Sequence, residues 1–440
     1  MKQLKIKDNQ FISKEDFYEV KSVVNRVADR TLEQLEHEGV FVFPEGLKDT
    51  EDLSKEQMIL QSYNDSIITG NVMGFLGVGD ERIVIESRFS KGENDYFFQY
   101  LLERVLDFPN FINLETNANQ DDKLFNLLLF LFPRYLSQAT RKGLFKTYIR
   151  NQYNDGNVKG SIDVARHIKK NTPFVGNIAY SQREYSYDNY LIELIRHTIE
   201  YIKGKPAGRM LLNPVKEEVK TVVQATPNYK AGDRRKIIDA NRKNVVRHAY
   251  YHEYRALQQL CILILRNEQH QYGAGARKVY GILFDGAWLW EEYINTLIGE
   301  LFYHPKNKAG DGAQRLFSTA EGKVGLIYPD FIGKDNMERV IADAKYKPLD
   351  NIGNKDYLQV LAYMFRFDAK KGFYLYPEAG EDDDLVLNLN KGTTYEKSVR
   401  PREDIMVVKH GLKIPKDAID YADFADKMIV SEQNFKKAFA

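Results

Sequence analysis

The spacing of apolar residues changes near residue 277, and the pattern that follows limits the fold more than any other part of the sequence. Residues 277–283 are strand-like, and residues 285–302 have the pattern of a helix. Three short strands, a helix and a further strand are predicted after them, at residues 314–317, 324–331, 338–345, 356–367 and 372–376. This order predicts an α/β core for the C-terminal part of the chain.

The preceding sequence predicts a region with strands, followed by one that is mainly helical. Residues 14–37 carry apolar side chains at helical spacing behind Ser13, a suitable N-cap residue. Residues 66–69 and 82–86 are predicted strands, with a turn at Gly79-Asp80 between them. Further helices are predicted at residues 95–150, 188–203 and 239–266.

These segments define the expected fold class, which is an α+β protein of several domains. The glycine-containing residues 273–275 mark a break before the C-terminal pattern. We therefore expect an N-terminal, β-containing domain with helices at residues 1–150 and a helical middle domain at residues 151–270. An α/β domain with a helical tail is expected at residues 271–440.

Composition limits where the protein works and what it binds. The single cysteine, Cys261, lies in an apolar run, so a buried thiol and a reducing cytoplasm are expected. The longest apolar stretch, residues 127–132, is far shorter than the roughly 20 residues that span a membrane. We expect a soluble, cytoplasmic protein without a membrane partner.

Charge is nearly balanced, at a formal net charge of +1, so any nucleic-acid surface must be a local patch. Residues 234–255 are a candidate, because they hold seven basic residues against Asp239 and Glu253. This segment can bind a DNA backbone, an acidic partner or only solvent. In the same segment His248 and His252 have the spacing of helical zinc ligands, but no third ligand is evident from the sequence.

A candidate catalytic motif begins at Pro329-Asp330 and continues at Asp343-Ala344-Lys345. Alternate side chains of a strand share a face, so Asp343 and Lys345 point the same way. A hairpin can place Asp330 beside Asp343, and oxygen ligands of this kind suit Mg²⁺. The metal would activate a water molecule, and Lys345 would orient that water or stabilise the phosphate in the transition state.

Neighbouring helices offer further site residues. Glu291, on the helix before the core strands, is expected to be a third carboxylate at the metal. Gln359 and Tyr363 are four residues apart on the next helix and share a face, from which they can bind a DNA phosphate or the catalytic lysine. Lys347 lies on the same strand face as Lys345 and is an alternative to it.

An Asp-x-Lys pair alone is a weak motif, because such pairs are common on the exposed faces of strands. Asp343, however, directly follows the apolar residues 340–342, where an unpaired charge would be costly. Asp330 likewise follows Leu326-Ile327-Tyr328. This context favours a metal-dependent nuclease of the PD-(D/E)xK type, with a restriction-endonuclease-like α/β core.

Four segments together resemble the McrC family, the nuclease subunit of McrBC-type 5-methylcytosine restriction systems. Three of them are residues 79–86, 158–163 and 183–190, and the fourth is the nuclease set described above. The resemblance implies that Asp330, Asp343 and Lys345 form the catalytic triad and that Glu291 is the helix acid. It also implies that double-stranded DNA is the substrate.

A partner is implied as well, because McrC-like proteins work with a McrB-like AAA+ GTPase ring. In that family the N-terminal part docks into the ring and stimulates GTP hydrolysis. The chain has no Gly-x-x-x-x-Gly-Lys-Ser/Thr motif, which fits an energy source in the partner. Residues 1–60 depart from the family pattern, since family members reach the first strand region sooner.

Two other functions remain open from the sequence. A stand-alone nuclease of DNA repair or phage defence would cleave without a GTPase. A catalytically silent regulator of an AAA+ ring would keep its biological activity after replacement of Asp343.

Overall fold

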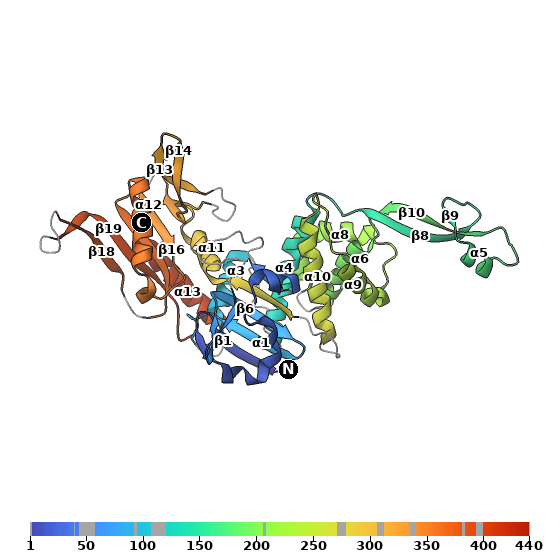
Figure 1. The fold of residues 1–440 in the computed structure, drawn as a ribbon, viewed down its shortest axis with the longest axis horizontal. Helices are drawn as coiled ribbons and strands as arrows, with labels where there is room; N and C mark the ends of the chain where they lie inside the picture. The colour runs from blue at the N-terminus through green and yellow to red at the C-terminus, as the bar shows by residue number, and fades with distance from the viewer. Residues whose placement is uncertain are drawn as a thin grey trace. The chain divides into compact units, whose positions relative to one another are not determined.

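The computed structural model describes residues 2–38, 40–43, 58–91, 95–106, 120–205, 208–270, 279–305, 312–334, 339–380, 383–392 and 399–439 (Figure 1). The chain divides into two compact units, one formed by residues 1–112 with 275–440 and the other by residues 113–274. This division differs from the expected boundaries at residues 150 and 270. The first and last parts of the chain share one unit, and the middle part is inserted between them.

A five-stranded sheet explains why the two ends of the chain share a unit. Its strand order is β1-β7-β6-β11-β3. The bounds are Lys2–Lys7 for β1, Val40–Phe43 for β3, Val72–Val78 for β6, Glu81–Glu86 for β7 and Val279–Asp285 for β11. Strand β11 pairs antiparallel with β6 and parallel with β3. We call this five-stranded sheet the N-terminal sheet. The segment predicted to open the C-terminal domain is thus one of its strands.

Short helices cover this sheet in place of the single helix predicted over residues 14–37. They are a 3-10 helix at Lys14–Val20, α1 at Lys21–Val27 and α2 at Leu32–Glu38. Helix α1 ends before Asp29, whose φ of 59° lies in the left-handed region and cannot continue a right-handed helix. The predicted N-cap Ser13 accepts a hydrogen bond from the backbone N–H of Glu15. A separate three-stranded sheet joins β2 (Phe11–Ser13), β5 (Ser66–Thr69) and β4 (Leu60–Tyr63).

The C-terminal part of the same unit is built on a six-stranded sheet of order β12-β15-β16-β17-β19-β18. The bounds are Phe302–Tyr303, Phe331–Gly333, Val340–Ala344, Lys371–Glu378, Arg400–Lys413 and Leu385–Lys391 in that order. Strands β16 and β17 are parallel and are joined through α12 (Asn354–Phe367). The predicted strand at residues 324–331 is interrupted, because Pro329 has no N–H for a ladder. It becomes β14 (Gly322–Ile327), paired with β13 (Gln314–Thr319), and then β15.

Three helices of this unit pack together through a buried acid. They are α3 (Tyr96–Leu106), α11 (Gly286–Ile298) and α13 (Tyr421–Lys436), the last being the expected helical tail. Glu432 of α13 accepts hydrogen bonds from Tyr100 Oη at 2.7 Å and from Tyr293 Oη at 2.8 Å. Arg104 donates to the other carboxylate oxygen at 3.2 Å. A buried charge is thereby paired and hydrogen-bonded, as burial requires.

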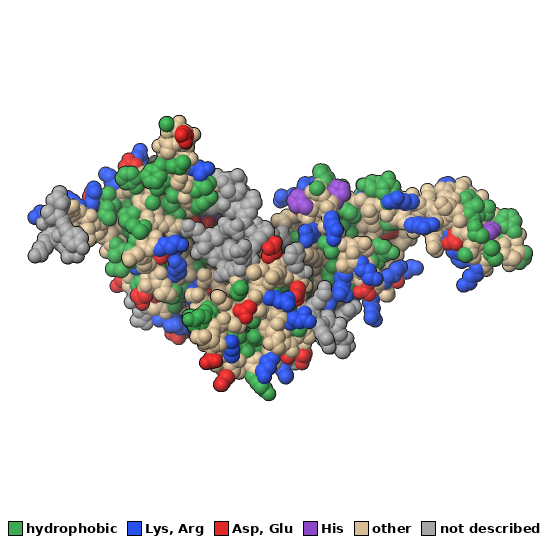
Figure 2. All heavy atoms as spheres, in the orientation of Figure 1, with side chains coloured by type: hydrophobic (Ala, Val, Ile, Leu, Met, Phe, Trp, Pro, Cys, Tyr) green, Lys and Arg blue, Asp and Glu red, His purple; other side chains and the backbone are tan. Residues whose placement is uncertain are grey.

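The inserted unit contains helices and a three-stranded sheet, whereas the sequence predicted a helical middle domain. The helices are α4 (Gln120–Thr140), α5 (Val164–Lys170), α6 (Tyr190–Lys203), α7 (Gly208–Leu212), α8 (Lys216–Ala225), α9 (Arg234–Lys243) and α10 (Glu253–His270). The sheet has the order β8-β10-β9, with bounds Thr147–Asp155, Ile178–Ser186 and Ser161–Ile162. Burial alternates residue by residue along β8, which is the period of a strand. The helix predicted over residues 95–150 did not account for this alternation at its end. Hydrophobic side chains gather around α5 at the end of this sheet (Figure 2), including Val164, Ile168 and Phe174.

None of the described helices is long and apolar enough to cross a membrane. Cys261 is buried in α10, as the sequence predicts. The glycine-containing break at residues 273–275 lies outside the described residues.

Candidate active site

Asp330, Asp343 and Lys345 meet near the carboxyl end of β16, an inner strand of the six-stranded sheet. Asp343 lies in β16 with 1% of its surface exposed, and Lys345 follows the end of that strand. Lys345 Nζ lies 2.7 Å from Asp343 Oδ2. Asp330 lies in the break between β14 and β15, and its Oδ2 accepts a 2.9 Å hydrogen bond from the backbone N–H of Ala344. The antiparallel pairing of β15 with β16 brings the two carboxylates together.

Burial raises the pKa of both carboxyl groups. For Asp330 the charges of Glu291 and Asp343 raise the pKa further, well above its ordinary value. For Asp343 the ion pair with Lys345 and a hydrogen bond with Asp330 offset part of the rise. Adjacent buried carboxyl groups of this kind bind a proton or a cation between them.

Lys345 is held as a cation beside this pair. Burial lowers the pKa of its amine, but the carboxylates of Asp343 and Asp330 outweigh burial and raise the pKa above its ordinary value. Its Nζ also donates to Gln359 Oε1 at 3.0 Å. The ammonium group is therefore fixed from two sides, by strand β16 and by helix α12.

Helix α12 presents one face to this lysine, as the spacing of Gln359 and Tyr363 predicts. Gln359 Nε2 donates to Tyr363 Oη at 2.7 Å, and Tyr363 Oη donates to the carbonyl oxygen of Tyr328 at 3.2 Å. A chain of hydrogen bonds thus connects Lys345 with the segment that precedes Asp330. The contact between Gln359 and the lysine is one of the two expected from the sequence, and the other, with a DNA phosphate, stays a prediction.

Lys347 occupies a different place from Lys345. Its Nζ donates to Asp356 Oδ1 at 3.0 Å, and Lys345 Nζ lies 3.7 Å from the same oxygen. Asp356 was missed by the sequence analysis, although it shares a helical face with Gln359 and Tyr363. Because Lys345 contacts Asp343 and Lys347 binds Asp356, the geometry favours Lys345 as the lysine of the site.

Glu291 and a histidine complete the surroundings of Asp330. His304 Nδ1 donates to the carbonyl oxygen of Asp330 at 2.9 Å, and its ring stacks on Phe331 with centroids 5.0 Å apart. His304 Nε2 lies 3.7 Å from Glu291 Oε1 and 3.8 Å from Glu292 Oε1. Burial lowers the pKa of His304, but Glu292, the Asp330 carbonyl and Glu291 together raise it above its ordinary value.

His304 was also missed, because no spacing relates it to the aspartates in the sequence. The charge of Glu291 raises the pKa of Asp330, and the role of Glu291 as the helix acid stays a prediction. Glu292 instead accepts a hydrogen bond from Trp288 Nε1 at 3.2 Å.

The donor set of this cluster suits a hard cation. Within the described ranges, no group of three or more His, Cys, Asp or Glu side chains has converged into a geometry that could hold a metal ion. Mg²⁺ does not require one, because it is usually bound by one or two carboxylates and keeps water or phosphate oxygens as its other ligands. The buried pair of Asp330 and Asp343 meets that requirement.

The sequence also offered a zinc site at His248 and His252 and a basic segment at residues 234–255. The helix predicted over residues 239–266 is interrupted between α9 and α10, so His248 and His252 are not on one helical face. His252 Nδ1 lies 3.1 Å from the carbonyl oxygen of Ala249. The zinc alternative therefore loses its helical basis. In the basic segment at residues 234–255, Lys and Arg side chains lie exposed over α9 (Figure 2). The structure does not distinguish a DNA backbone, an acidic partner or solvent as what this segment contacts.

Fold and site define an α+β protein of two compact units, with a buried Asp-Asp-Lys cluster on its C-terminal sheet. Residues 67–377, well over half of the chain, match the model of the McrBC family, which is described as a McrBC 5-methylcytosine restriction system component. The chain belongs to this family. No curated protein matches the chain.

Two solved structures are similar to the chain. The first is the refined half-complex from a tetradecameric assembly of Thermococcus gammatolerans McrB AAA+ hexamers with bound McrC, with 17% identity and a TM-score of 0.45. The match covers 98% of this chain and 99% of that chain. The second is the cryo-EM structure of the Thermococcus gammatolerans McrBC complex, with 15% identity, a TM-score of 0.34, and coverage of 68% and 87%.

Proposed function

We propose that this chain is the nuclease subunit of a McrBC-type restriction system and hydrolyses phosphodiester bonds of double-stranded DNA with Mg²⁺. The observation that carries the proposal is the buried cluster of Asp330, Asp343 and Lys345, with Lys345 Nζ 2.7 Å from Asp343 Oδ2. Two buried carboxylates and a lysine on a strand and the turn beside it are the elements of a PD-(D/E)xK nuclease. Membership of the McrBC family supports this assignment.

Each residue of the cluster has a role in this proposal. Asp330 and Asp343 would hold the Mg²⁺ ion. Glu291 would become a further oxygen ligand by moving towards the ion, since no three acidic groups among the described residues converge on one point. When bound, the ion supplies an activated water molecule and neutralises negative charge at the scissile phosphate. Lys345, fixed by Asp343 and Gln359, places a positive charge where charge develops on the phosphate during hydrolysis.

The helix α12 keeps this lysine oriented. Gln359 accepts from Lys345 and donates to Tyr363, which itself donates to the carbonyl oxygen of Tyr328. Preorganised donors cost no reorganisation at the moment of reaction, so a fixed lysine is more effective than a mobile one.

The proposal includes a McrB-like AAA+ GTPase ring as the partner, whose GTP hydrolysis this subunit stimulates. Family membership supports it, and the absence of a phosphate-loop motif from the sequence fits a division of labour between two proteins. The first similar structure contains McrC bound to McrB hexamers.

Plasmid cleavage tests the proposal. Wild type, Asp343→Ala and Asp404→Ala are compared with Mg²⁺, with and without a McrB-like GTPase and GTP, on methylated and unmethylated DNA. Asp404 is a matched control because it lies in β19 of the same sheet but pairs with Arg402 at the surface. Cleavage by wild type and Asp404→Ala, and not by Asp343→Ala, is the expected result.

The other outcomes separate the alternatives. Cleavage that needs no GTPase would replace the restriction subunit by a stand-alone nuclease. Equal cleavage by wild type and Asp343→Ala would remove the chemistry from this cluster. A protein that never cleaves but stimulates the GTPase would be a regulator.

A further inference from the structure

Tyr346 connects the proposed catalytic strand to the N-terminal sheet. It directly follows Lys345 in the chain, and only 4% of its surface is exposed. Its hydroxyl lies 2.7 Å from Ser87 Oγ and 3.3 Å from Met73 Sδ. Met73 belongs to β6, and Ser87 follows the end of β7. The hydroxyl of Tyr346 therefore contacts strand β6 and the residue that follows β7 in the other sheet.

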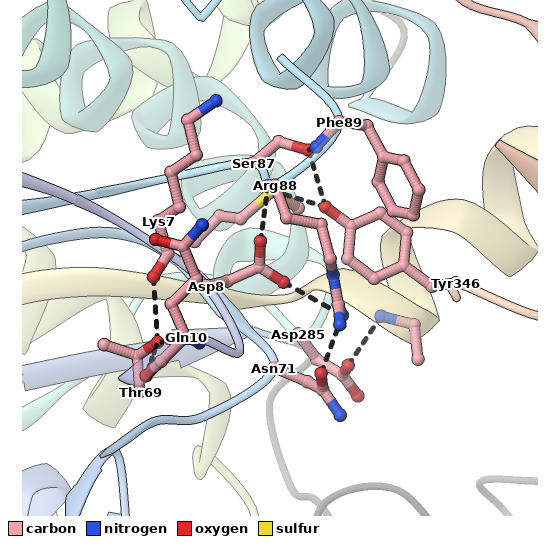
Figure 3. Close-up of polar contacts among 12 residues, drawn as sticks. Lys7, Asp8, Gln10, Thr69, Asn71, Ser87, Arg88, Phe89, Asp285 and Tyr346 are labelled. Atoms are coloured by element: carbon pink, nitrogen blue, oxygen red, sulfur yellow. Dashed lines mark hydrogen bonds and ion pairs between the residues drawn. The ribbon is translucent and has the colours of Figure 1, made fainter. Parts of the chain in front are cut away.

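An ion pair fixes the face of the Tyr346 ring. The guanidinium of Arg88 lies 4.8 Å from the ring centroid. Arg88 Nη2 donates to Asn71 Oδ1 at 2.7 Å and pairs with Asp8 Oδ2 at 3.0 Å. The backbone N–H of Arg88 donates to Asp8 Oδ1 at 2.6 Å. Figure 3 shows Arg88 held between Asp8 and Asn71, with Tyr346 beside its guanidinium.

The same ring packs on the start of helix α11. A methyl group placed on Gly286 would lie 2.7 Å from Tyr346 Cε1, so the glycine allows this close approach. The backbone N–H of Gly286 donates to the carbonyl oxygen of Asn71 at 3.0 Å. Asn71 thus binds the start of α11, the helix that carries Glu291, and also binds Arg88, which packs on Tyr346.

Lys345 is thus held by its backbone from two directions. Its N–H donates to the carbonyl oxygen of Leu375 in β17 at 2.8 Å, and its carbonyl oxygen accepts from Lys347 N at 2.8 Å. Tyr346 fixes the next residue to the N-terminal sheet. The contact between the Tyr346 hydroxyl and Ser87 Oγ therefore lies one residue away from the backbone of Lys345.

We propose that Tyr346 is a positioning residue that sets the orientation of Lys345 through its hydroxyl bond to Ser87 and its packing against Arg88. This inference rests on the proposed nuclease function. The N-terminal sheet would then contribute to catalysis, because it holds the residue next to the proposed catalytic lysine. It goes beyond the roles of Gln359 and Asp343, which hold the amine and not the backbone.

The test separates positioning from stability by a matched pair of variants. Tyr346→Phe removes one buried hydroxyl and keeps the ring. Tyr100→Phe removes another buried hydroxyl of the same unit, which donates to Glu432 Oε1 at 2.7 Å in the group around α13. Ser87→Ala removes the partner of Tyr346 and serves if Tyr346→Phe does not fold. Each full-length variant is assayed with its GTPase partner for kcat and KM on plasmid DNA, and for its melting temperature.

Positioning predicts that Tyr346→Phe and Ser87→Ala each lower kcat at least about fivefold with KM for DNA unchanged, because a small misplacement of a reacting group is costly. The double variant is expected to lose less kcat than the two single losses combined, since both substitutions remove the bond between Tyr346 and Ser87. Tyr100→Phe is expected to keep the wild-type kcat. Equal kcat in Tyr346→Phe and Tyr100→Phe, or a loss that appears only in KM, would overturn the inference.

Failure of the proposed function gives a different pattern. If the wild type does not cleave, or if Asp343→Ala cleaves equally well, the nuclease assignment itself is wrong. Wild-type cleavage that Asp343→Ala abolishes and Tyr346→Phe leaves unchanged overturns only the role of Tyr346.

Discussion

His304 donates from Nδ1 to the carbonyl oxygen of Asp330, and its Nε2 faces Glu291 at 3.7 Å. One imidazole thus touches the backbone of one proposed metal ligand and the side chain of another. Groups in this second layer orient metal ligands, and their loss typically reduces metal affinity or activity about 10- to 100-fold.

We therefore expect His304→Ala to raise the Mg²⁺ concentration needed for half-maximal cleavage at least about tenfold. His167, on α5 of the other unit and outside the basic segment, provides the control, and His167→Ala is expected to behave as wild type. Titration of cleavage with Mg²⁺ at saturating DNA measures the effect. An unchanged Mg²⁺ requirement in His304→Ala would assign the histidine to packing on Phe331 alone.

The two lysines of the site provide a second prediction. Lys345→Met is expected to lower kcat on the order of 100-fold or more, because the charge next to Asp343 and the phosphate is lost. Lys347→Met removes an amine that binds Asp356 and is expected to cost less than about tenfold. Single-turnover cleavage by both variants checks the order. A larger loss in Lys347→Met would exchange the roles of the two lysines.

Buried Glu432 provides a prediction about stability. Glu432→Ala leaves the hydroxyls of Tyr100 and Tyr293 without their acceptor and removes the partner of Arg104. Arg104 is partly exposed and regains water, so the loss comes mainly from the two buried hydroxyls, each of which costs about 1–3 kcal/mol when its acceptor is removed. The free energy of unfolding in urea measures the loss, which is expected to be smaller in Glu432→Gln. An effect below about 0.5 kcal/mol, the usual range for surface substitutions, would contradict the buried network.

Asp95 predicts how stability depends on pH. Burial raises its pKa from 3.8 to about 7, although the backbone N–H groups of Phe98 and Ser87 lower it in part. The folded state therefore binds this proton more tightly than the unfolded state. The stabilisation is fully present below about pH 4 and is lost as the pH rises towards 7.

Comparison with Asp95→Asn isolates this contribution, because asparagine does not titrate. The free energy of unfolding of the variant, relative to wild type, is expected to rise between pH 4 and pH 7. The exposed Asp65, replaced by Asn, provides the control. A difference between Asp95→Asn and wild type that stays constant over this pH range would show that Asp95 does not titrate there.

Local sequence patterns predicted the parts of the site that depend on short spacing. Alternation along β16 placed Asp343 and Lys345 on one face, and Pro329 marked the break that holds Asp330. Helical spacing joined Gln359 to Tyr363. These relationships are set by the geometry of one strand or one helix, so they can be read from a few residues.

Long-range pairing could not be predicted in the same way. Nothing in residues 279–285 shows to which sheet this strand belongs, because the strands of the N-terminal sheet and of the C-terminal sheet are both apolar. His304 reaches Asp330 only through the pairing of β12 with β15. The strand at Thr147–Asp155 was hidden for another reason, since its alternating polar residues follow directly on a helical region.

The position of β11 in the N-terminal sheet has a consequence for synthesis on the ribosome. β6 and β7 emerge early, but the strand that separates β6 from β3 is made roughly 200 residues later, about 10–40 s at ordinary elongation rates. The inserted unit is complete before β11 appears and can fold first. We therefore expect nascent chains that end before residue 279 to expose an unfinished sheet edge, and chaperones to bind them until β11 closes it.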